Sequence, residues 1–233
     1  MRQILKDGFE ALGLPFSDEI YGRFRTYYEL LTEKNAVMNL TAITGEEDTA
    51  RLHFLDCAAL CSLHDFSGAS VIDVGTGAGF PGLPLKITVP DISLTLLDSH
   101  SKRMAFLGDT CRSLGFTDVR CVCARAEDAA ADIGGRFDVS VSRAVARLNI
   151  LCELCLPFVR TGGVFIAMKG PDCAEELSEA KRAILLLGGA APEIRKYIVP
   201  GTGIIHSAVI IKKTGRTPKG YPRNFSKIKK APL

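Results

Sequence analysis

The stretch DVGTGAGFPG, residues 73–82, has the composition of a loop that holds a small ligand against its backbone. Glycine suits such a loop, because a backbone that passes close to a ligand has no room for Cβ atoms. Two glycine patterns overlap here. G-x-G-x-G begins at Gly75 and is typical of proteins that bind S-adenosylmethionine (SAM), whereas G-x-G-x-x-G begins at Gly77 and matches the dinucleotide fingerprint.

The register of this loop favours SAM. A dinucleotide fingerprint starts where the preceding strand ends, which is Gly75, and Phe80 then stands where the third glycine belongs. Asp73 favours SAM as well, because its carboxylate would attract the ammonium group of a methionine moiety and repel a pyrophosphate. We predict that Gly75, Gly77 and Gly79 form a SAM loop. The G-x-G-x-x-G match that begins at Gly77 is then a chance match. A dinucleotide loop and a glycine turn without a ligand are the alternatives.

Further acids stand where such a ligand needs hydrogen-bond acceptors. Asp98 ends the apolar run SLTLLD and can accept from ribose hydroxyls, for either ligand. Glu127, in ARAED after the next run, can accept from an adenine amino group. Arg143 and Lys169 end two later apolar runs, so these residues would meet at one edge of a parallel sheet.

The elements that must position these residues alternate between short apolar runs and helical patterns. The runs SVIDVG, SLTLLD, VRCVCA, FDVSVSRA and GVFIAMKG predict strands, and EIRKYIVP with SAVIIKK predicts a final pair. We predict an α/β fold, the Rossmann-like fold of class I SAM-dependent methyltransferases, with a mostly parallel, doubly wound sheet and an antiparallel last strand. The expected organisation is an N-terminal helical extension (1–66), a SAM-binding methyltransferase domain (67–212) and a basic C-terminal tail (213–233).

Local patterns also predict several helix boundaries. Ser17 is expected to cap a helix whose apolar residues begin at Ile20, and a second helix is expected over about 46–63. Pro81 is expected at the first position of the helix after the glycine loop, and Ser99 as the cap of the helix after SLTLLD.

At the level of whole motifs, the sequence resembles the ribosomal RNA small subunit methyltransferase G family. The resemblance runs from about residue 39 to the end and rests on MNLTAI, HFLDCAAL, the glycine loop, LLDSHSKRMAFL, RAE, FDVSVSRAVA, CLPFVRTGGVFIAMKG and YPRN, in family order. It implies methyl transfer from SAM to N7 of a guanine in the 530 loop of 16S rRNA, with S-adenosylhomocysteine as product. The family's SAM contacts correspond to Gly75, Phe80, Ala126, Glu127 and Arg143. The chain departs from many members at 226–228, where Ser-Lys-Ile replaces Gly-x-Pro.

The motifs that are missing agree with a ring-nitrogen acceptor. Guanine N7 has an in-plane lone pair and no proton, so its attack on a sulfonium methyl group needs positioning and electrostatics rather than a general base. Exocyclic-amine methylases carry N/D-P-P-Y/F at the end of the fourth strand, where this chain reads SRAV. No Pro-Cys supplies the nucleophile of a cytosine-C5 methylase.

Arg143 is the predicted catalytic residue. Its guanidinium can engage the carboxylate of SAM or guanine O6, which would leave N7 free to react. The structural alternative is an ion pair with a neighbouring acid such as Asp73. Phe80 can pack on SAM, stack on a flipped base, or simply pack its own helix against the sheet.

Residues before the glycine loop have two interpretations. His53 and Asp56 are three apart and so share a helix face. They either close the substrate side of the site or tether the N-terminal helices to the sheet. Asn39 and Thr41, in a predicted loop, have the same two interpretations.

The C-terminal tail concentrates the positive charge of the chain. The whole sequence has 29 basic and 26 acidic residues, yet residues 212–233 hold eight basic residues and no acid, which leaves the first 211 residues with a net charge of −5. An acidic body with a basic tail suggests a polyanionic partner, with a solvated terminus as the alternative. The family resemblance implies that this partner is 16S rRNA or the small ribosomal subunit. The predicted phosphate contacts are Lys169, Lys212, Lys213, Arg216, Lys219, Arg223, Lys227, Lys229 and Lys230.

Composition excludes other classes of protein. The eight cysteines form no zinc-ligand set, so we expect buried structural thiols in a reducing cytoplasm and no bound metal. No apolar run is long enough to span a membrane, and we expect a monomer. A small-molecule methylase would not need the basic tail, and a non-catalytic RNA-binding protein would not need the glycine loop with Asp73 and Asp98. An NAD(P) oxidoreductase is the most distant alternative.

Overall fold

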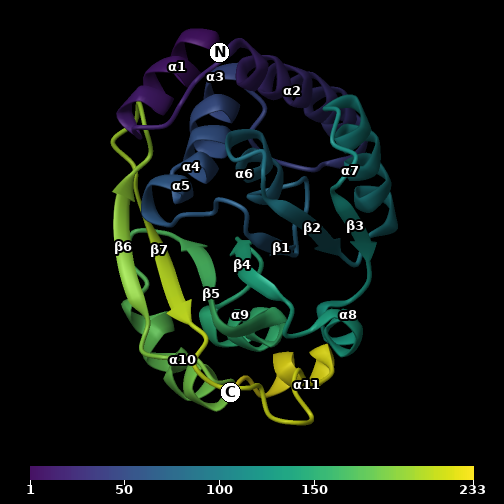
Figure 1. Ribbon diagram of the computed structural model, residues 1–233, viewed down its shortest axis with the longest axis vertical. Coiled ribbons are helices and arrows are strands. Elements are labelled where there is room, and N and C mark those ends of the chain that lie inside the picture. The colour runs from purple at the N-terminus through teal and green to yellow at the C-terminus, as the bar shows by residue number, and fades with distance from the viewer.

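A seven-stranded sheet organises the protein. The computed structural model describes residues 1–233, and its strands lie in the order β3-β2-β1-β4-β5-β7-β6 (Figure 1). Their bounds are β1 (Ser70–Val74), β2 (Ser93–Asp98), β3 (Arg120–Cys123), β4 (Phe137–Arg143), β5 (Val159–Lys169), β6 (Glu193–Ile198) and β7 (Ile205–Lys212). Each run that the sequence predicts as a strand therefore forms one.

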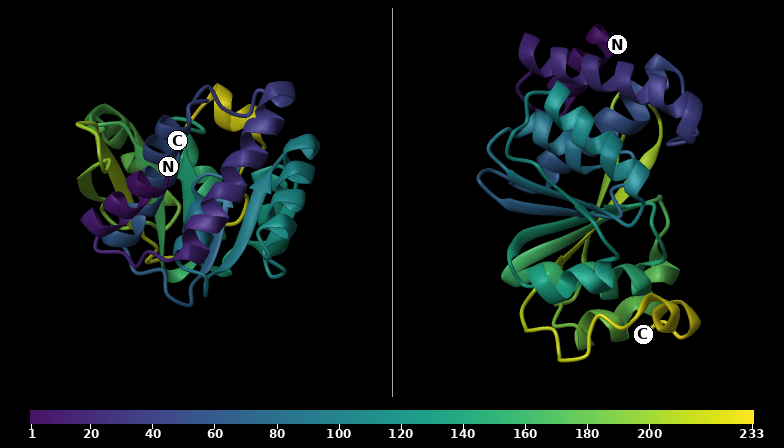
Figure 2. Two further views of the ribbon diagram at one scale, coloured as in Figure 1. Left: turned by 90° about the horizontal axis from the view of Figure 1, so that it is seen from above. Right: turned by 90° about the vertical axis from the view of Figure 1, so that its right-hand side faces the viewer.

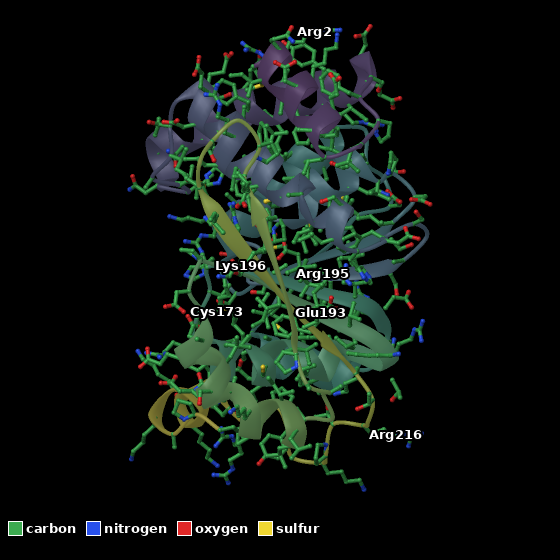
Figure 3. The ribbon with its side chains drawn as sticks, turned by 90° about the vertical axis from the view of Figure 1, so that its left-hand side faces the viewer. Arg2, Cys173, Glu193, Arg195, Lys196 and Arg216 are labelled. Carbon is green, nitrogen blue, oxygen red and sulfur yellow. The ribbon has the colours of Figure 1, made fainter.

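Strand directions confirm the predicted fold class. The pairs β3–β2, β2–β1, β1–β4 and β4–β5 are parallel, whereas β7 is antiparallel to both β5 and β6. The strand order reverses at β1, and in such sheets the loops that leave the neighbouring strands diverge and open a crevice at their carboxyl ends. Strand β6 forms the outer edge, where Figure 3 labels Glu193, Arg195 and Lys196.

Helices cover both faces of the sheet, and the two termini lie at opposite ends of this three-layer stack (Figure 2, right). One layer contains α1 (Arg2–Ala11), α2 (Asp18–Met38), α3 (Glu46–Thr49), the π-helix η1 (Ala50–Leu55), α4 (Asp56–Ala58), α5 (Leu60–Leu63), α6 (Gly82–Thr88) and α7 (Ser101–Ser113). The other contains α8 (Ala126–Ile133), α9 (Leu148–Cys155), the 3-10 helix η2 (Leu156–Phe158), α10 (Ala174–Leu186) and α11 (Phe225–Lys230). No pattern described above predicts α8, α10 or α11.

Side chains alternate between two cores because successive strand residues face opposite sides. In β1, Val71 belongs to the core on the N-terminal side and Ile72 to the core on the other side. The N-terminal helices share the first of these cores with the sheet, through Phe24, Tyr27 and Phe54. This packing fixes their position over the carboxyl ends of the strands.

Two of the four helix predictions agree with the structure. Ser17 caps α2 by accepting from Ile20 N at 3.2 Å, and the helix expected over 46–63 is present as three short α-helical segments and the π-helix η1. Two expectations are wrong. Helix α6 begins at Gly82, just after Pro81, and α7 has His100 rather than Ser99 at its N-cap, because the backbone N–H of His100 is fixed by the Asp98 carboxylate at 2.9 Å.

The eight cysteines are all free thiols. Five are buried and two are half-buried, as expected for structural thiols, but Cys123 is exposed. It ends β3, which is short and lies at an edge of the sheet, so no neighbouring strand covers it. No group of three or more His, Cys, Asp and Glu side chains could hold a metal ion, and no helix has the length and apolar character needed to cross a membrane.

Candidate functional site

A cavity of about 500 Å³ lies at the carboxyl edge of the sheet, within the size range of small-molecule sites. The loops after β1, β2, β3 and β4 all contribute to its wall. Among the predicted cofactor residues, Asp73 and Gly79 do not line it. Those that do are Gly75, Gly77, Phe80, Asp98, Ala126, Glu127 and Arg143, joined by Thr41 and His53 from the N-terminal layer.

The three loop glycines are required for different reasons. All have positive φ angles: 73° at Gly75, 61° at Gly77 and 109° at Gly79. A Cβ at Gly75 would lie 2.6 Å from Cγ2 of Val145, and one at Gly79 would lie 2.7 Å from the Tyr27 hydroxyl, so the protein itself packs against both. At Gly77 a Cβ would meet nothing nearer than 3.9 Å. Gly77 is therefore the point where the backbone is open to a ligand.

Asp73 supports the loop from beneath. Its Oδ2 accepts from the Thr76 hydroxyl at 2.6 Å and from Gly82 N at 2.8 Å, while the buried Oδ1 has no partner. Burial raises the pKa of Asp73 to about 6. Gly82, the last glycine of the G-x-G-x-x-G pattern, has a packing role. A Cβ there would lie 2.6 Å from Leu96 and keep α6 away from the sheet.

Asp98 connects the loops after β1 and β2. Its Oδ2 accepts from Gly77 N at 3.1 Å, and its Oδ1 accepts from His100 N at 2.9 Å. The Arg103 guanidinium lies 3.6 Å from Oδ2. These contacts fix the carboxylate at the cavity wall with further lone pairs for a hydroxyl donor.

Arg143, at the end of β4, is held by the N-terminal helical layer. Its Nη2 donates to His53 Nδ1 at 2.8 Å, and its Nη1 donates to Leu52 O at 3.2 Å and to Asp56 Oδ2 at 3.3 Å. The acid that pairs with it is therefore Asp56, 87 residues earlier in the chain, and not Asp73. Three acceptors fix the orientation of one guanidinium.

His53 lies between Arg143 and the loop after α2. Because Arg143 can only donate, Nδ1 of His53 accepts, and Nε2 carries the proton that it donates to Thr41 Oγ1 at 2.8 Å. Burial, aided by the charge of Arg143, lowers the pKa of His53 to about 3, so the ring is neutral. Phe80 stacks on this ring with centroids 4.3 Å apart and lies 4.7 Å from the Arg143 guanidinium.

Asp56 ties the N-terminal helices to the far side of the sheet. Its Oδ1 accepts from the Tyr197 hydroxyl in β6 and from His206 Nδ1 in β7, both at 2.8 Å. Its carboxylate is buried and does not line the cavity. Asp56 therefore matches the tether interpretation, whereas its helix neighbour His53 faces the cavity. Asn39 ends α2 in a left-handed conformation and does not line the cavity either.

Glu127 connects the cavity to the C-terminal segment. Its Oε1 accepts from the backbone N–H of Phe225, the first residue of α11, at 3.0 Å. Phe225 lines the cavity, although it lies 98 residues from Glu127 in the sequence. The guanidinium of Arg125 lies 5.7 Å from the Phe225 ring.

Lys213 does not match its predicted role as a phosphate contact. Its side chain is buried, and Nζ donates to Leu156 O at 3.0 Å and to Leu187 O and Thr217 Oγ1 at 2.5 Å. Burial lowers the pKa of Lys213 to about 8. The prediction is wrong because the ammonium group satisfies the ends of two helices inside the protein.

Two other predicted RNA contacts have acidic partners within the chain. Lys169 pairs with Glu176 at 2.6 Å and is largely buried. Arg223 binds both carboxylate oxygens of the fully buried Glu153, at 2.8 and 2.6 Å. Both residues thus have structural partners, and neither offers a free cation.

The remaining predicted contacts are exposed but lie in different places. Lys212 pairs with Val164 and therefore lies at the amino edge of the parallel strands, away from the cavity. Arg216 follows Gly215, whose N–H donates to Gly188 O just after α10, and it projects from the molecule in Figure 3. Lys219 lies in the segment that leads back towards α11. Lys227, Lys229 and Lys230 are exposed on α11 itself, the helix whose first residue, Phe225, lines the cavity.

Several cavity residues have no counterpart among the predicted ones. Among them are Leu40, Arg103, Arg125, Val145, Leu154 and Phe225. Arg125 and Val145 lie within two residues of predicted ones at strand ends, so proximity alone could have identified them. Nothing in the sequence places Phe225 there, because its contact depends on the path of the whole tail.

Comparison with known proteins agrees with this geometry. The family model described as rRNA small subunit methyltransferase G matches residues 20–198. The chain belongs to this family. It is 46% identical over 233 residues to a ribosomal RNA small subunit methyltransferase G of Clostridium botulinum (strain Loch Maree / Type A3), covering 99% of this chain and 98% of the relative. The relative from Alkaliphilus metalliredigens (strain QYMF), with the same name, is 44% identical over 235 residues, covering 100% and 98%.

Solved structures with similar folds include methyltransferases of low sequence identity. A methyltransferase from Pyrococcus furiosus has a TM-score of 0.55 at 15% identity, covering 83% of this chain and 99% of that one. TrmN from Thermus thermophilus has a TM-score of 0.54 at 21% identity, covering 68% and 48%. At such identities the likeness establishes the fold alone.

Proposed function

We propose that this protein transfers a methyl group from SAM to N7 of a guanine in the 530 loop of 16S rRNA. The observation that carries the proposal is the single cavity in which the open backbone at Gly77, Asp98, Glu127 and Arg143 meet, in a chain of the rRNA small subunit methyltransferase G family. The names of the relatives support the RNA substrate.

The order of residues along the sheet edge suits an extended ligand such as SAM. Glu127 follows β3, Asp98 ends β2, the glycine loop follows β1 and Arg143 ends β4, and these strands are neighbours in that order. Glu127 would hold the adenine end and Asp98 the ribose. The unpaired Oδ1 of Asp73 is a buried acceptor beneath the loop, and an ammonium group in the cavity would be attracted to its charge through the loop or through water. When bound, SAM supplies an electrophilic methyl group on a sulfonium centre.

The residues at the β4 end suit an acceptor that loses no proton. His53 is neutral and both of its ring nitrogens are hydrogen-bonded, so it is not placed to act as a base. Arg143 is fixed by three acceptors and by the face of Phe80, which leaves a rigid cation at the cavity wall. Such a group can hold a carboxylate or guanine O6 while N7 approaches the methyl group in line.

The exposed lysines of α11 extend this site towards a polyanion. They lie on the helix that begins at the cavity residue Phe225 and have no acidic partner, whereas Lys213 is buried and Arg223 is paired with Glu153. Contacts with RNA phosphates would make binding fall steeply with added salt.

The test is incubation with labelled SAM and small ribosomal subunits that lack the modification, followed by mapping of the labelled base. We expect label at N7 of one guanine in the 530 loop. Label at another atom or another base would contradict the specificity, and the absence of any label in RNA would contradict the function.

A further inference from the structure

The C-terminal segment contributes part of the cavity wall. Phe225 lines it next to Ala126 and Glu127, and its backbone N–H is bound by Glu127 Oε1 at 3.0 Å. Figure 1 shows α11 beside α8, the helix that begins with these two residues. Phe225 therefore lies at the end of the cavity that follows β3.

This is the adenine end in the ligand orientation proposed above, on which the inference rests. Stacking of a base on an aromatic side chain typically strengthens binding about tenfold. Glu127 uses Oε1 for the tail and has no protein partner for Oε2, which is free to accept from an adenine amino group. One carboxylate would then hold the ligand and α11 together.

A short set of contacts holds α11 in this position, and Tyr221, Phe225 and Leu233 around it pack against the core without being fully buried. Arg223 is anchored on the buried Glu153 of α9, Phe225 on Glu127, and Ile228 is the one fully buried residue of the helix. A six-residue helix has little intrinsic stability, so its placement depends on these contacts. Any ligand that adds a contact to Phe225 favours the docked position.

The same helix carries the exposed cations. Lys227, Lys229 and Lys230 form no ion pair, and no acid occurs between residues 212 and 233. When α11 is docked, these lysines lie within five residues of Phe225, which lines the cavity. An RNA backbone that reaches the cavity would meet them there.

We propose that α11 is shared by the cofactor and RNA sites: Phe225 closes the adenine end of the cavity, and the lysines of the same helix bind RNA phosphates. A ligand in the cavity stabilises the docked helix and so pre-organises the lysines for RNA. Linkage is reciprocal, so RNA strengthens ligand binding by the same factor.

The experiment compares the full-length wild type, Phe225→Ala and the matched control Ser226→Ala, whose side chain is exposed and does not line the cavity. Titration calorimetry measures the affinity for S-adenosylhomocysteine and for 5′-methylthioadenosine, which has the adenine and ribose but no amino acid part. The affinity for an unmodified 16S rRNA fragment is measured with and without saturating S-adenosylhomocysteine. Thermal unfolding of the free proteins reports whether each variant folds, and Phe225→Leu replaces the alanine variant if that one does not.

We expect Phe225→Ala to weaken both nucleoside ligands about tenfold and Ser226→Ala to change neither by more than about twofold. S-adenosylhomocysteine should strengthen RNA binding by wild type about fivefold and should not strengthen it for Phe225→Ala. Wild-type affinity of Phe225→Ala for 5′-methylthioadenosine, or an unchanged effect of S-adenosylhomocysteine on its RNA binding, would overturn this inference and leave the proposed function intact. A wild-type protein that does not bind S-adenosylhomocysteine would overturn both.

Discussion

Two segments that flank the sheet strands in sequence reach the same cavity, and they are held in different ways. The N-terminal rim consists of Leu40, Thr41 and His53, and the C-terminal rim is Phe225 with the rest of α11. The N-terminal rim is joined to Arg143 and Asp56 by successive hydrogen bonds of 2.8–3.3 Å.

The two rims also differ in the packing beneath them. Beneath the N-terminal rim, Tyr27, Phe54 and Phe80 pack with centroid distances of 5.3–6.3 Å, and the Tyr27 hydroxyl donates to Ala78 O at 2.7 Å. The C-terminal rim rests on a six-residue helix with one fully buried side chain. Elements with few buried contacts open at lower free-energy cost than the core does.

The difference between the two rims indicates which of them suits methyl transfer and which suits coupling between two ligands. The proposed methyl transfer needs groups fixed within a fraction of an ångström, and the hydrogen bond from Arg143 to His53 of the N-terminal rim fixes the guanidinium in this way. Communication between two ligands needs an element whose position a ligand can shift. The C-terminal rim is such an element, so we assign chemistry to one rim and coupling to the other.

Removal of Arg143, which is hydrogen-bonded to His53 of the N-terminal rim, should have the largest effect on methylation. Arg143→Ala is expected to lower kcat by about 1,000-fold, or about 4 kcal/mol, because a preorganised charge at the transfer site is lost. Methylation of unmodified small subunits with labelled SAM measures this. Arg147→Ala is the matched control, since Arg147 is exposed, pairs with Glu179 and does not line the cavity. Near-normal methylation by a folded Arg143→Ala protein would contradict the assignment of Arg143 as the catalytic residue.

Removal of Arg223 should destabilise the C-terminal rim, because the ion pair with Glu153 holds this segment on the protein. Arg223→Ala leaves the fully buried Glu153 without its cation, although the backbone N–H of residue 223 still donates to it, and we expect a loss of about 3 kcal/mol in the free energy of unfolding. Urea unfolding at pH 7 measures it. Arg216→Ala, an exposed arginine of the same tail without an ion pair, should change stability by less than about 0.5 kcal/mol. Equal effects of the two substitutions would mean that the ion pair does not anchor the tail.

The sequence predicts the parts of the site that depend on local pattern. Glycines with a strand before them, an acid at the end of the next strand, and Arg143 at the end of β4 all follow from apolar runs and their boundaries. The parallel topology then brings them together, because carboxyl ends of parallel strands share one edge. Gly77, Asp98 and Glu127 were found in this way.

The sequence does not predict contacts that depend on the path of the whole chain. Asp56 and Asp73 are both acids near Arg143, and only the placement of the N-terminal helices decides that Asp56 pairs with it. Lys213 and Lys229 look alike in a basic tail, yet β7 ends at the amino edge, where Lys213 is buried, and α11 returns to the cavity. Charge patterning identifies the tail but cannot distinguish its structural cations from its free ones.

Acidic pH should change the stability of the glycine loop that lies between the two rims, because the buried carboxylate of Asp73 supports this loop. Its pKa is about 6 in the folded protein and 3.8 in the reference state, so the folded protein binds the proton more tightly. The stabilisation from protonation is fully present below pH 3.8 and is lost as the pH rises through 6. Relative to Asp73→Asn, wild type should therefore gain about 2 kcal/mol of unfolding free energy between pH 7 and pH 4.

Urea unfolding of both proteins across this range measures the difference, and other titrating groups cancel in it. Asp91→Asn is the matched control, because Asp91 is an exposed aspartate that accepts from Gly68 N at 3.0 Å and lies outside the cavity wall. It should show no comparable gain on acidification. If the difference between wild type and Asp73→Asn does not change with pH, the buried carboxylate does not destabilise the loop at neutral pH, and the unpaired Oδ1 has a partner in solution.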